Sequence, residues 1–271
     1  MKAYRILPSI KMERDGPIDS DDMVAIESVL ELRLGNEFLA AFICTPGLER
    51  ELAIGYLLST GVLTNIETIQ NIVVRNKKAT IHLKHGETIN KDRGFSQIRR
   101  FMSTECSAPE MLIELRTGGS IPTVKSSYEV SLDDIEYLAM KVNEGQEIRG
   151  QTGATHAAYI HDRSKNTGYL AEDIGRHNAV DKAIGLAVEA GFNLTNCHLY
   201  STGRLTADIV SKCAWTMIPL VVSSSAATDA GIHFARKANI TLIGWVRRRQ
   251  CRIYHSGAVR VNWTKDSQLS E

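Results

Sequence analysis

The chain has 271 residues, of which 43% are hydrophobic and 23% are charged, the balance of a globular protein with one or two domains. Lys and Arg number 32 against 31 Asp and Glu. No overall charge therefore attracts nucleic acid or an anionic membrane, and any anion-binding surface must be local. No apolar run approaches the length of a membrane span, and residues 1–16 lack the apolar core of a signal peptide. We expect a cytoplasmic protein that binds neither nucleic acid nor membrane.

Residues 22–43 predict strands joined by a tight turn at Gly35-Asn36, and a second hairpin is expected around Asn76-Lys77. Between them, Thr45 and Pro46 predict the N-cap and first position of a helix that ends at Gly61. These elements indicate an N-terminal α+β domain over residues 1–116. The Gly-, Ser- and Pro-containing stretch that follows predicts a linker over residues 117–130.

From residue 131 onward, strands and helices alternate. Ser131 predicts an N-cap whose helix carries acids in its first turn. The later apolar patterns predict strands at 155–161, 169–172, 198–201, 220–222 and 240–246, and helices at 178–190, 205–217 and 229–238. This alternation indicates a three-layer α/β domain with a largely parallel sheet over residues 131–262, followed by a tail at 263–271.

In such a sheet, ligands bind where strands end and helices begin, and polar segments occupy these junctions here. In residues 151–158, Gly153 allows close approach of a ligand to the backbone, and His156 supplies a titratable ring. The alternative is a simple turn into a strand with His156 in the core. In residues 172–182, Arg176 and a helix N-terminus are suited to a phosphate. A structural ion-pair network is an equal alternative on this segment.

Two further junctions, 201–204 and 223–228, combine hydroxyls with Gly or Arg. Each alone is typical of a helix N-cap. Successive corners of this kind indicate one rim suited to a phosphate-bearing ligand. The basic run 247–249, with Arg252, is more typical of a solvated hairpin turn.

Five cysteines are scattered along the chain, and none lies within three residues of another. This spacing excludes a CxxC pair for zinc or redox exchange. Cys106 lies in a loop just before a short helix expected near Ser107, and a helix N-terminus lowers the pKa of a thiol. Glu105 opposes thiolate formation, so these residues alone favour reactivity only weakly.

Together, the segments 152–158, 172–182, 201–204 and 225–228 resemble, in sequence and order, the hallmarks of the FdhD/NarQ family of formate dehydrogenase accessory proteins. The resemblance spans nearly the whole chain, and the EDIGRHNAVDK string is its most specific part. It implies a cytidine-deaminase-like, three-layer C-terminal domain beside a smaller α+β domain. It also implies no structural metal, and the chain has neither the HxE nor the PCxxC of the zinc deaminases.

The resemblance implies that the protein accepts persulfide sulfur from a cysteine desulfurase and transfers it to the molybdenum bis-guanine-dinucleotide cofactor of formate dehydrogenase. Guanine nucleotides would mimic this bound substrate, and the protein would form a homodimer. Cys106 would be the catalytic sulfur carrier. The residues implied in cofactor binding are Thr152, Gly153, Thr155, His156, Asp173, Gly175, Arg176, His177, Asn178, Asp181, Lys182, Ser201, Gly203, Arg204, Ser225 and Thr228.

One departure bears on this chemistry. Family members typically carry a CxxC loop where this chain has Cys106-Ser107-Ala108-Pro109. A single thiolate can still carry a persulfide, but it cannot release the sulfur by forming a disulfide with a neighbour. The alternative is a chaperone that binds the cofactor without transferring sulfur. A zinc-dependent nucleoside deaminase is a third hypothesis that rests on fold analogy alone.

Overall fold

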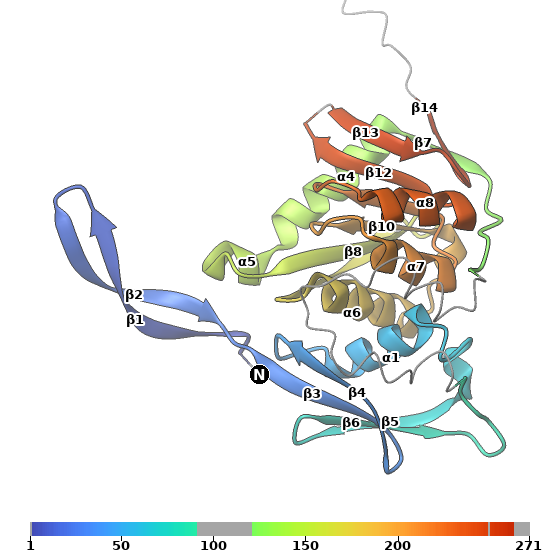
Figure 1. The fold of residues 1–271 in the computed structure, drawn as a ribbon, viewed down its shortest axis with the longest axis horizontal. Coiled ribbons are helices and arrows are strands. Elements are labelled where there is room, and N and C mark those ends of the chain that lie inside the picture. Colours follow the sequence, from blue (N-terminus) through green and yellow to red (C-terminus); the bar gives the residue numbers. More distant parts are fainter. Residues whose placement is uncertain (1, 91–120, 249, 263–271) are drawn as a thin grey trace, which may run out of the picture.

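The computed structural model describes residues 2–90, 121–248 and 250–262. The described strands form a four-stranded sheet in the order β4-β3-β6-β5, a six-stranded sheet in the order β13-β12-β11-β10-β8-β9, and two-stranded pairs β1-β2 and β14-β7. The four-stranded sheet lies below the six-stranded one, and the β1-β2 hairpin projects away from both (Figure 1). The class is therefore mixed α/β, as expected.

The N-terminal sheet consists of β3 (Ser28–Leu34), β4 (Glu37–Cys44), β5 (Ile69–Arg75) and β6 (Lys78–Leu83), with the 3-10 helix η1 (Ile66–Thr68) before β5. Its inner face buries Leu30, Leu32 and Ile81 against the helix α1 (Glu49–Ser59). Asn76 and Lys77 both have positive φ, 50° and 60°, which a two-residue hairpin turn requires. The predicted hairpin at this position is confirmed.

The start of α1 differs from the prediction. The helix begins at Glu49, after Leu48 in the left-handed region with φ 60°. Thr45 is not its N-cap, because the backbone of Thr45 bonds to the other domain: its N–H donates to Asp173 at 3.0 Å and its carbonyl accepts from Lys182 at 2.7 Å. Tertiary bonds therefore override the local capping signal.

A long hairpin precedes this sheet and was not predicted in full. β1 (Tyr4–Glu13) pairs antiparallel with β2 (Gly16–Ala25) along the whole length of both strands. The prediction included only the end of β2. Apolar residues occur on both faces of the hairpin, and no simple alternation marks one buried side.

The six-stranded sheet is mixed rather than largely parallel. Its strands are β8 (His156–Asp162), β9 (Thr167–Asp173), β10 (Cys197–Ser201), β11 (Leu220–Ser223), β12 (Thr241–Arg247) and β13 (Gln250–His255). Only β10–β11 and β11–β12 pair in parallel. The other three pairings are antiparallel, because β8–β9 and β12–β13 are hairpins and β8 runs opposite to β10.

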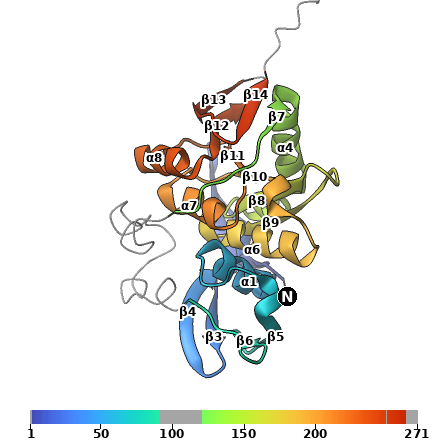
Figure 2. The same cartoon turned by 90° about the vertical axis from the view of Figure 1, so that its right-hand side faces the viewer.

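Helices cover both faces of this sheet. α6 (Arg176–Glu189), α7 (Ala207–Trp215) and α8 (Asp229–Ala238) pack on one face, and α4 (Leu132–Gly145) packs on the other. Figure 2 shows α7 and α8 on one side of the strands and α4 on the opposite side. The predicted cap of α4 is confirmed, because Ser131 and Asp134 form a reciprocal capping box. The finer likeness to the deaminase fold stays a prediction.

Four smaller elements complete the C-terminal part. The short helix α5 (Glu147–Thr152) was not predicted, and η3 (Leu194–Asn196) precedes β10. β7 (Tyr128–Ser131) and β14 (Val259–Asn262) pair in parallel beside α4. None of the helices in the described ranges combines the length and the hydropathy that a membrane span requires.

The two parts of the molecule meet where α1 crosses α6. A Cβ atom at Gly55 of α1 would overlap the backbone of Asp181, and one at Gly185 of α6 would overlap the backbone of Glu51. Glycine at both positions therefore allows the two helices to approach backbone to backbone. The expected boundary at 117–130 falls partly outside the described residues and stays a prediction.

Candidate functional site

The four polar segments meet at one edge of the six-stranded sheet. This carboxyl edge is where β9, β10, β11 and β12 end and β8 begins, on the left of the sheet in Figure 1. The register places His156 beside Asp173, and Ser201 between Ala158 and Ser223. α6, α7 and α8 all begin close to this edge. The four segments that the sequence singled out are thus neighbours in space.

His156 lies within electrostatic reach of three arginines. It is half-buried, and its Nδ1 is 3.4 Å from the Thr202 hydroxyl. Burial lowers the pKa of His156, and the guanidinium groups of Arg176 and Arg149 lower it further. Asp173 opposes this effect, and Arg204 adds the smallest lowering. The ring is therefore neutral near pH 7, beside three side chains that favour an anion.

The 201–204 corner packs directly on Arg176. A Cβ atom at Gly203 would lie 2.8 Å from the Cβ of Arg176 and 2.9 Å from its Cδ. Only glycine lets this corner approach so closely. Arg176 is the first residue of α6, and Gly175 caps that helix without a side-chain hydrogen bond. A helix start of this kind, next to the exposed Arg204, is suited to binding phosphate.

Hydroxyl groups build the third and fourth corners. The Ser201 hydroxyl accepts from the N–H of Gly203 at 3.1 Å. The Ser223 hydroxyl donates to the Gly203 carbonyl at 2.7 Å and accepts from the N–H of Ser225 at 2.8 Å. Thr228 caps α8 through its hydroxyl. Ser201 and Thr228 therefore shape the corners through bonds within the protein.

The first polar segment, residues 151–158, is hydrogen-bonded to Glu172. The Thr155 hydroxyl is buried and donates to the Glu172 carboxylate at 2.8 Å. The Thr152 hydroxyl donates to a backbone carbonyl within α5, and Gly153, with φ 68°, ends that helix. The Thr155 carbonyl also accepts a hydrogen bond from the Arg149 guanidinium at 2.6 Å, so both Thr155 and His156 lie beside the arginines.

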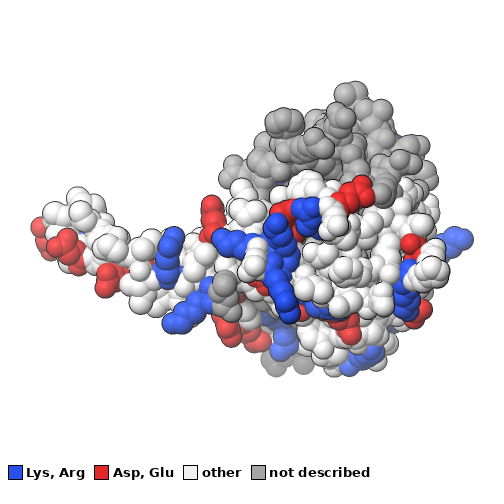
Figure 3. Space-filling model, turned by 90° about the horizontal axis from the view of Figure 1, so that it is seen from below, with Lys and Arg blue, Asp and Glu red and all other residues white. Residues whose placement is uncertain are grey.

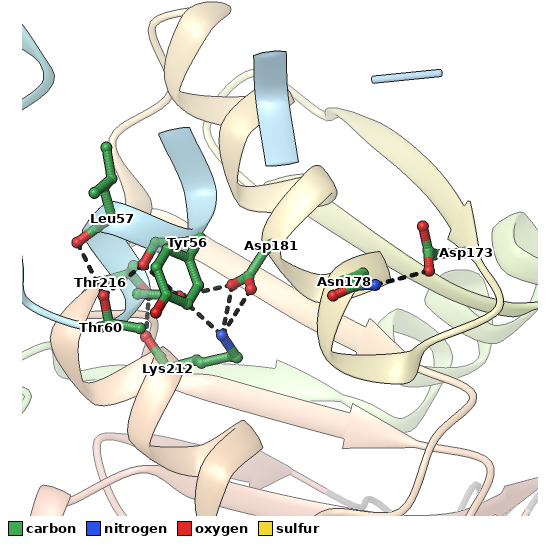
Figure 4. Close-up of polar contacts among 9 residues, drawn as sticks. Tyr56, Leu57, Thr60, Asp173, Asn178, Asp181, Lys212 and Thr216 are labelled. Carbon is green, nitrogen blue, oxygen red and sulfur yellow. Dashed lines mark hydrogen bonds and ion pairs between the residues drawn. The ribbon is translucent and has the colours of Figure 1, made fainter. Parts of the chain in front are cut away.

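Three residues of the second segment are bound to the chain at the end of β4. The Lys182 ammonium is 2.7 Å from the Asp173 carboxylate and donates to the Thr45 carbonyl. The Asn178 amide donates to Asp173 at 3.1 Å, as Figure 4 shows, and to the Ile43 carbonyl at 2.8 Å. The structure thus shows the internal network that was one of the two interpretations of this segment.

Asp181 lies in a separate buried group between α1, α6 and α7. Its carboxylate accepts from the Ser59 hydroxyl at 2.6 Å and from the Lys212 ammonium at 2.7 and 2.8 Å (Figure 4). The Ser59 hydroxyl also accepts from Lys212 at 3.1 Å. This group joins the three helices, and its polar atoms are used within the protein. His177, one turn earlier, is half-buried.

The sequence reasoning missed an aromatic residue at this edge. Trp245 is exposed and has a left-handed backbone with φ 53°, a strained conformation for a bulky residue. The backbone N–H of Trp245 donates to the Ser225 carbonyl at 2.9 Å. The guanidinium carbons of Arg247 and Arg252 lie 5.6 and 5.7 Å from the centre of its ring. An aromatic residue next to a basic run was the signal that could have found it. Arg249 lies outside the described residues.

Cys106 and the short helix expected near Ser107 also lie outside the described residues. Of the four cysteines in the described ranges, Cys44, Cys197 and Cys213 are buried and Cys251 is half-buried. Burial raises the pKa of Cys44 and Cys197 to about 12 and also raises that of Cys213 and Cys251. These thiols are protonated at neutral pH and are poor nucleophiles.

Comparison with known proteins places the chain in a family. The model of the FdhD/NarQ family matches residues 25–261, and the chain therefore belongs to that family, as the resemblance indicated. A protein of Sulfurisphaera tokodaii named Sulfur carrier protein FdhD is 31% identical over 255 residues, covering 90% of this chain and 94% of its own. A protein of the same name from Shouchella clausii is 29% identical over 240 residues, covering 88% of this chain and 90% of its own.

A solved structure supports the same fold. The crystal structure of a presumed formate dehydrogenase accessory protein from Desulfotalea psychrophila superimposes with a TM-score of 0.74. The alignment covers 94% of this chain and 98% of that chain, at 22% sequence identity. At this identity the likeness shows the fold alone.

Proposed function

We propose that this protein is a sulfur carrier that serves formate dehydrogenase. In this proposal it accepts persulfide sulfur from a cysteine desulfurase on Cys106 and transfers it to the molybdenum bis-guanine-dinucleotide cofactor. Family membership and the names of the relatives support the role of sulfur carrier. The observation that carries the cofactor-binding part is the meeting of four polar segments at the carboxyl edge.

The chemistry of the carboxyl edge fits a nucleotide-bearing cargo. The uncapped start of α6, with Arg176 and Arg204, would hold pyrophosphate oxygens. The exposed ring of Trp245, with Arg247 nearby, would support a guanine base by stacking. The His156 ring is uncharged near pH 7, so it can donate one hydrogen bond to the ligand without contributing a positive charge.

The contacts suggest a division of roles among the predicted residues. We assign ligand contact to His156, Arg176, Arg204 and Ser225. Gly203 would let the 201–204 corner pack on Arg176, and Gly175 would lead into the start of α6. The internal bonds of Asp173, Asn178, Asp181 and Lys182 suit residues that hold α6 in place rather than residues that touch the cofactor. Thr152, Gly153, Thr155, Ser201 and Thr228 would shape the surrounding corners.

The sulfur-accepting step is redox-neutral. The Cys106 thiolate attacks the terminal sulfur of the persulfide on the desulfurase, the sulfur–sulfur bond of that persulfide breaks, and the desulfurase thiolate leaves. The raised pKa of the four described cysteines supports Cys106 as the acceptor, because protonated thiols react slowly.

Intact-mass measurement after incubation with a cysteine desulfurase and cysteine tests the carrier role. We expect wild type to gain a cyanide-labile mass of about one sulfur, roughly 32 Da, through its activated thiolate. Cys106→Ala should gain none, whereas Cys251→Ala, the matched control, should gain the same mass as wild type. A gain on Cys106→Ala equal to that of wild type would contradict the assignment.

A chaperone that binds the cofactor without transferring sulfur is the second candidate. One observation favours it: the carboxyl edge brings together phosphate-binding and base-stacking groups without any cysteine among the described residues at its corners. Absence of a mass gain on both wild type and Cys106→Ala would support this candidate. A homodimer, implied by the family resemblance, also belongs to the proposal.

A further inference from the structure

The β1-β2 hairpin presents an apolar face to solvent. In the antiparallel register Ile6 lies opposite Met23, and Ile10 and Met12 follow on the same face of β1. These four side chains are between 40% and 73% exposed. Leu7, Ile18 and Val24 on the opposite face are also exposed, at 36–50%, but Ile6, Ile10 and Met12 are the most exposed apolar groups of the hairpin. Exposed apolar groups on a projecting element indicate a contact surface.

The same hairpin is acidic. Residues 4–25 contain five acids and three bases, a net charge of −2. Asp19 lies opposite Ile10, and Asp21 lies opposite Pro8, so both carboxylates share the apolar face. We call this face of Ile6, Ile10, Met12 and Met23, with its two aspartates, the arm face. A matching surface should be apolar and basic.

The chain carries such a surface on its own N-terminal sheet. The side of that sheet turned away from α1 exposes Val29, Phe38 and Ile43, each between 43% and 52% exposed. Arg33 and Lys78 lie on the same side, both within ion-pair distance of Glu31. Two bases beside one acid leave this side positive. We call it the outer face.

Figure 3 views the molecule from the side of the outer face and shows Lys and Arg side chains gathered where the hairpin meets the body. Two further basic residues lie at the turn between β5 and β6: Arg75 at the end of β5 and Lys77 in the turn. The arm face and the outer face are therefore complementary in charge as well as in hydropathy.

These two faces do not meet within one chain. Only two residues, 26 and 27, separate β2 from β3, so the hairpin runs on from the sheet and away from the body (Figure 1). Ten residues per strand give the hairpin a length of about 34 Å. Its apolar side chains remain exposed in the single chain.

We propose that the arm face packs on the outer face of a second copy of this chain. An isolated two-stranded hairpin is only marginally stable in water, so a hairpin of this length needs a covering surface. A client that binds transiently would leave the apolar face exposed most of the time, with the risk of aggregation. A second copy is always present and offers the complementary surface.

The arrangement is reciprocal. The arm face of each chain packs on the outer face of the other chain, so the two contacts are equivalent and form a two-fold symmetric dimer. The outer face looks away from the six-stranded sheet (Figure 1). This inference rests on the proposed homodimer and assigns its contact.

Light scattering coupled to size-exclusion chromatography tests the assignment. Wild type should have twice the chain mass of 30.0 kDa. Ile10→Asp on the arm face and Phe38→Asp on the outer face should each raise the dimer dissociation constant by about tenfold or more, because each places a charge in a buried contact. Met140→Asp on α4 changes an apolar residue that is as exposed as Phe38 and lies away from both faces, and it should leave the mass unchanged.

A charge exchange makes the test independent of misfolding. Asp19→Lys with Asp21→Lys on one chain, and Arg33→Glu with Lys78→Glu on another, should each weaken the homodimer. Mixing the two variants should restore a dimer, because every arm then meets an outer face of opposite charge. If wild type is monomeric, the proposed homodimer itself fails. If wild type is a dimer and the arm and outer-face variants remain dimers, the homodimer stands and the assigned contact is wrong.

Discussion

The Lys182 ammonium and the Asp173 carboxylate are 2.7 Å apart, with side chains that are 1% and 0% exposed. The pair joins α6 and β9 to the segment between β4 and α1, because Lys182 also donates to the Thr45 carbonyl and Asp173 accepts from the Thr45 N–H. The charges of the segment that most strongly identifies the family therefore hold the N-terminal domain against α6.

Removing one member of this pair should strongly destabilise the protein. Lys182→Met leaves the Asp173 carboxylate buried without its counter-ion, and the free energy of unfolding should fall by about 3–5 kcal/mol. Urea denaturation at pH 7 measures this. Lys141→Met removes an exposed pair, in which the ammonium is 3.4 Å from Glu144, and should cost no more than about 1 kcal/mol.

A double variant separates the pair from its surroundings. Asp173→Asn with Lys182→Met removes both charges, so its destabilisation should be smaller than the sum of the two single effects. If the double variant loses as much stability as the two single variants together, the two side chains act independently.

Local patterns in the sequence were sufficient for most elements of the C-terminal domain. The helix predicted at 229–238 is α8 with the same bounds, because a hydroxyl cap, an amphipathic pattern and a following left-handed Asn239 all agree. The β1-β2 hairpin was missed because its strands carry apolar residues on both faces. The start of α1 was misplaced because Thr45 bonds to Asp173 and Lys182, which lie 128 and 137 positions further along the chain.

The candidate site was located from sequence only at the level of segments. Gly, Ser and Arg at strand ends indicated the right corners, since these residues suit tight turns and anions. Which side chains turn inward depends on partners that only the fold brings together, as with Asp181 and Lys212 on different helices. Trp245 was missed because its orientation follows from a backbone conformation that the sequence does not reveal.

Gly203→Ala should weaken anion binding without unfolding the protein. The new methyl group would lie 2.8 Å from the Cβ of Arg176, so Arg176 or the corner must shift. Calorimetric titration with pyrophosphate should show a dissociation constant raised by roughly tenfold, the loss of one charge-assisted hydrogen bond. Gly150→Ala meets nothing within 4 Å and serves as the control. Unaltered pyrophosphate binding by Gly203→Ala would argue against Arg176 as a ligand.

Acid should destabilise the protein through a buried histidine pair at the other end of the sheet. His198 and His161 are neighbours on β10 and β8, with ring centres 5.9 Å apart. Burial, aided by the charges of His161 and Arg163, lowers the pKa of His198 to about 4. The unfolded chain protonates near pH 6.5, so stability is complete above that pH and is lost as the pH falls from about 6.5 toward 4.

The loss attributable to His198 should be about 3 kcal/mol across this range. His198→Gln should lower stability at pH 7 but show a smaller further loss between pH 7 and pH 4.5 than wild type in urea denaturation. His85→Asn changes an exposed histidine and should retain the wild-type dependence. Parallel pH profiles for wild type and His198→Gln would contradict the prediction.

Trp245→Gly should separate base recognition from phosphate recognition at the carboxyl edge. Glycine accepts the left-handed φ of 53° at this position, so the fold and the 223–228 corner should be retained. Loss of the ring removes a stacking surface worth about 1–3 kcal/mol per base, which predicts a roughly tenfold weaker affinity for guanosine diphosphate and unchanged affinity for pyrophosphate. Trp245→Phe keeps an aromatic face and should bind guanosine diphosphate nearly as tightly as wild type. An equal loss for both ligands would instead indicate that the substitution disturbs Arg247 and the corner, and no loss for either would remove Trp245 from the proposed cofactor site.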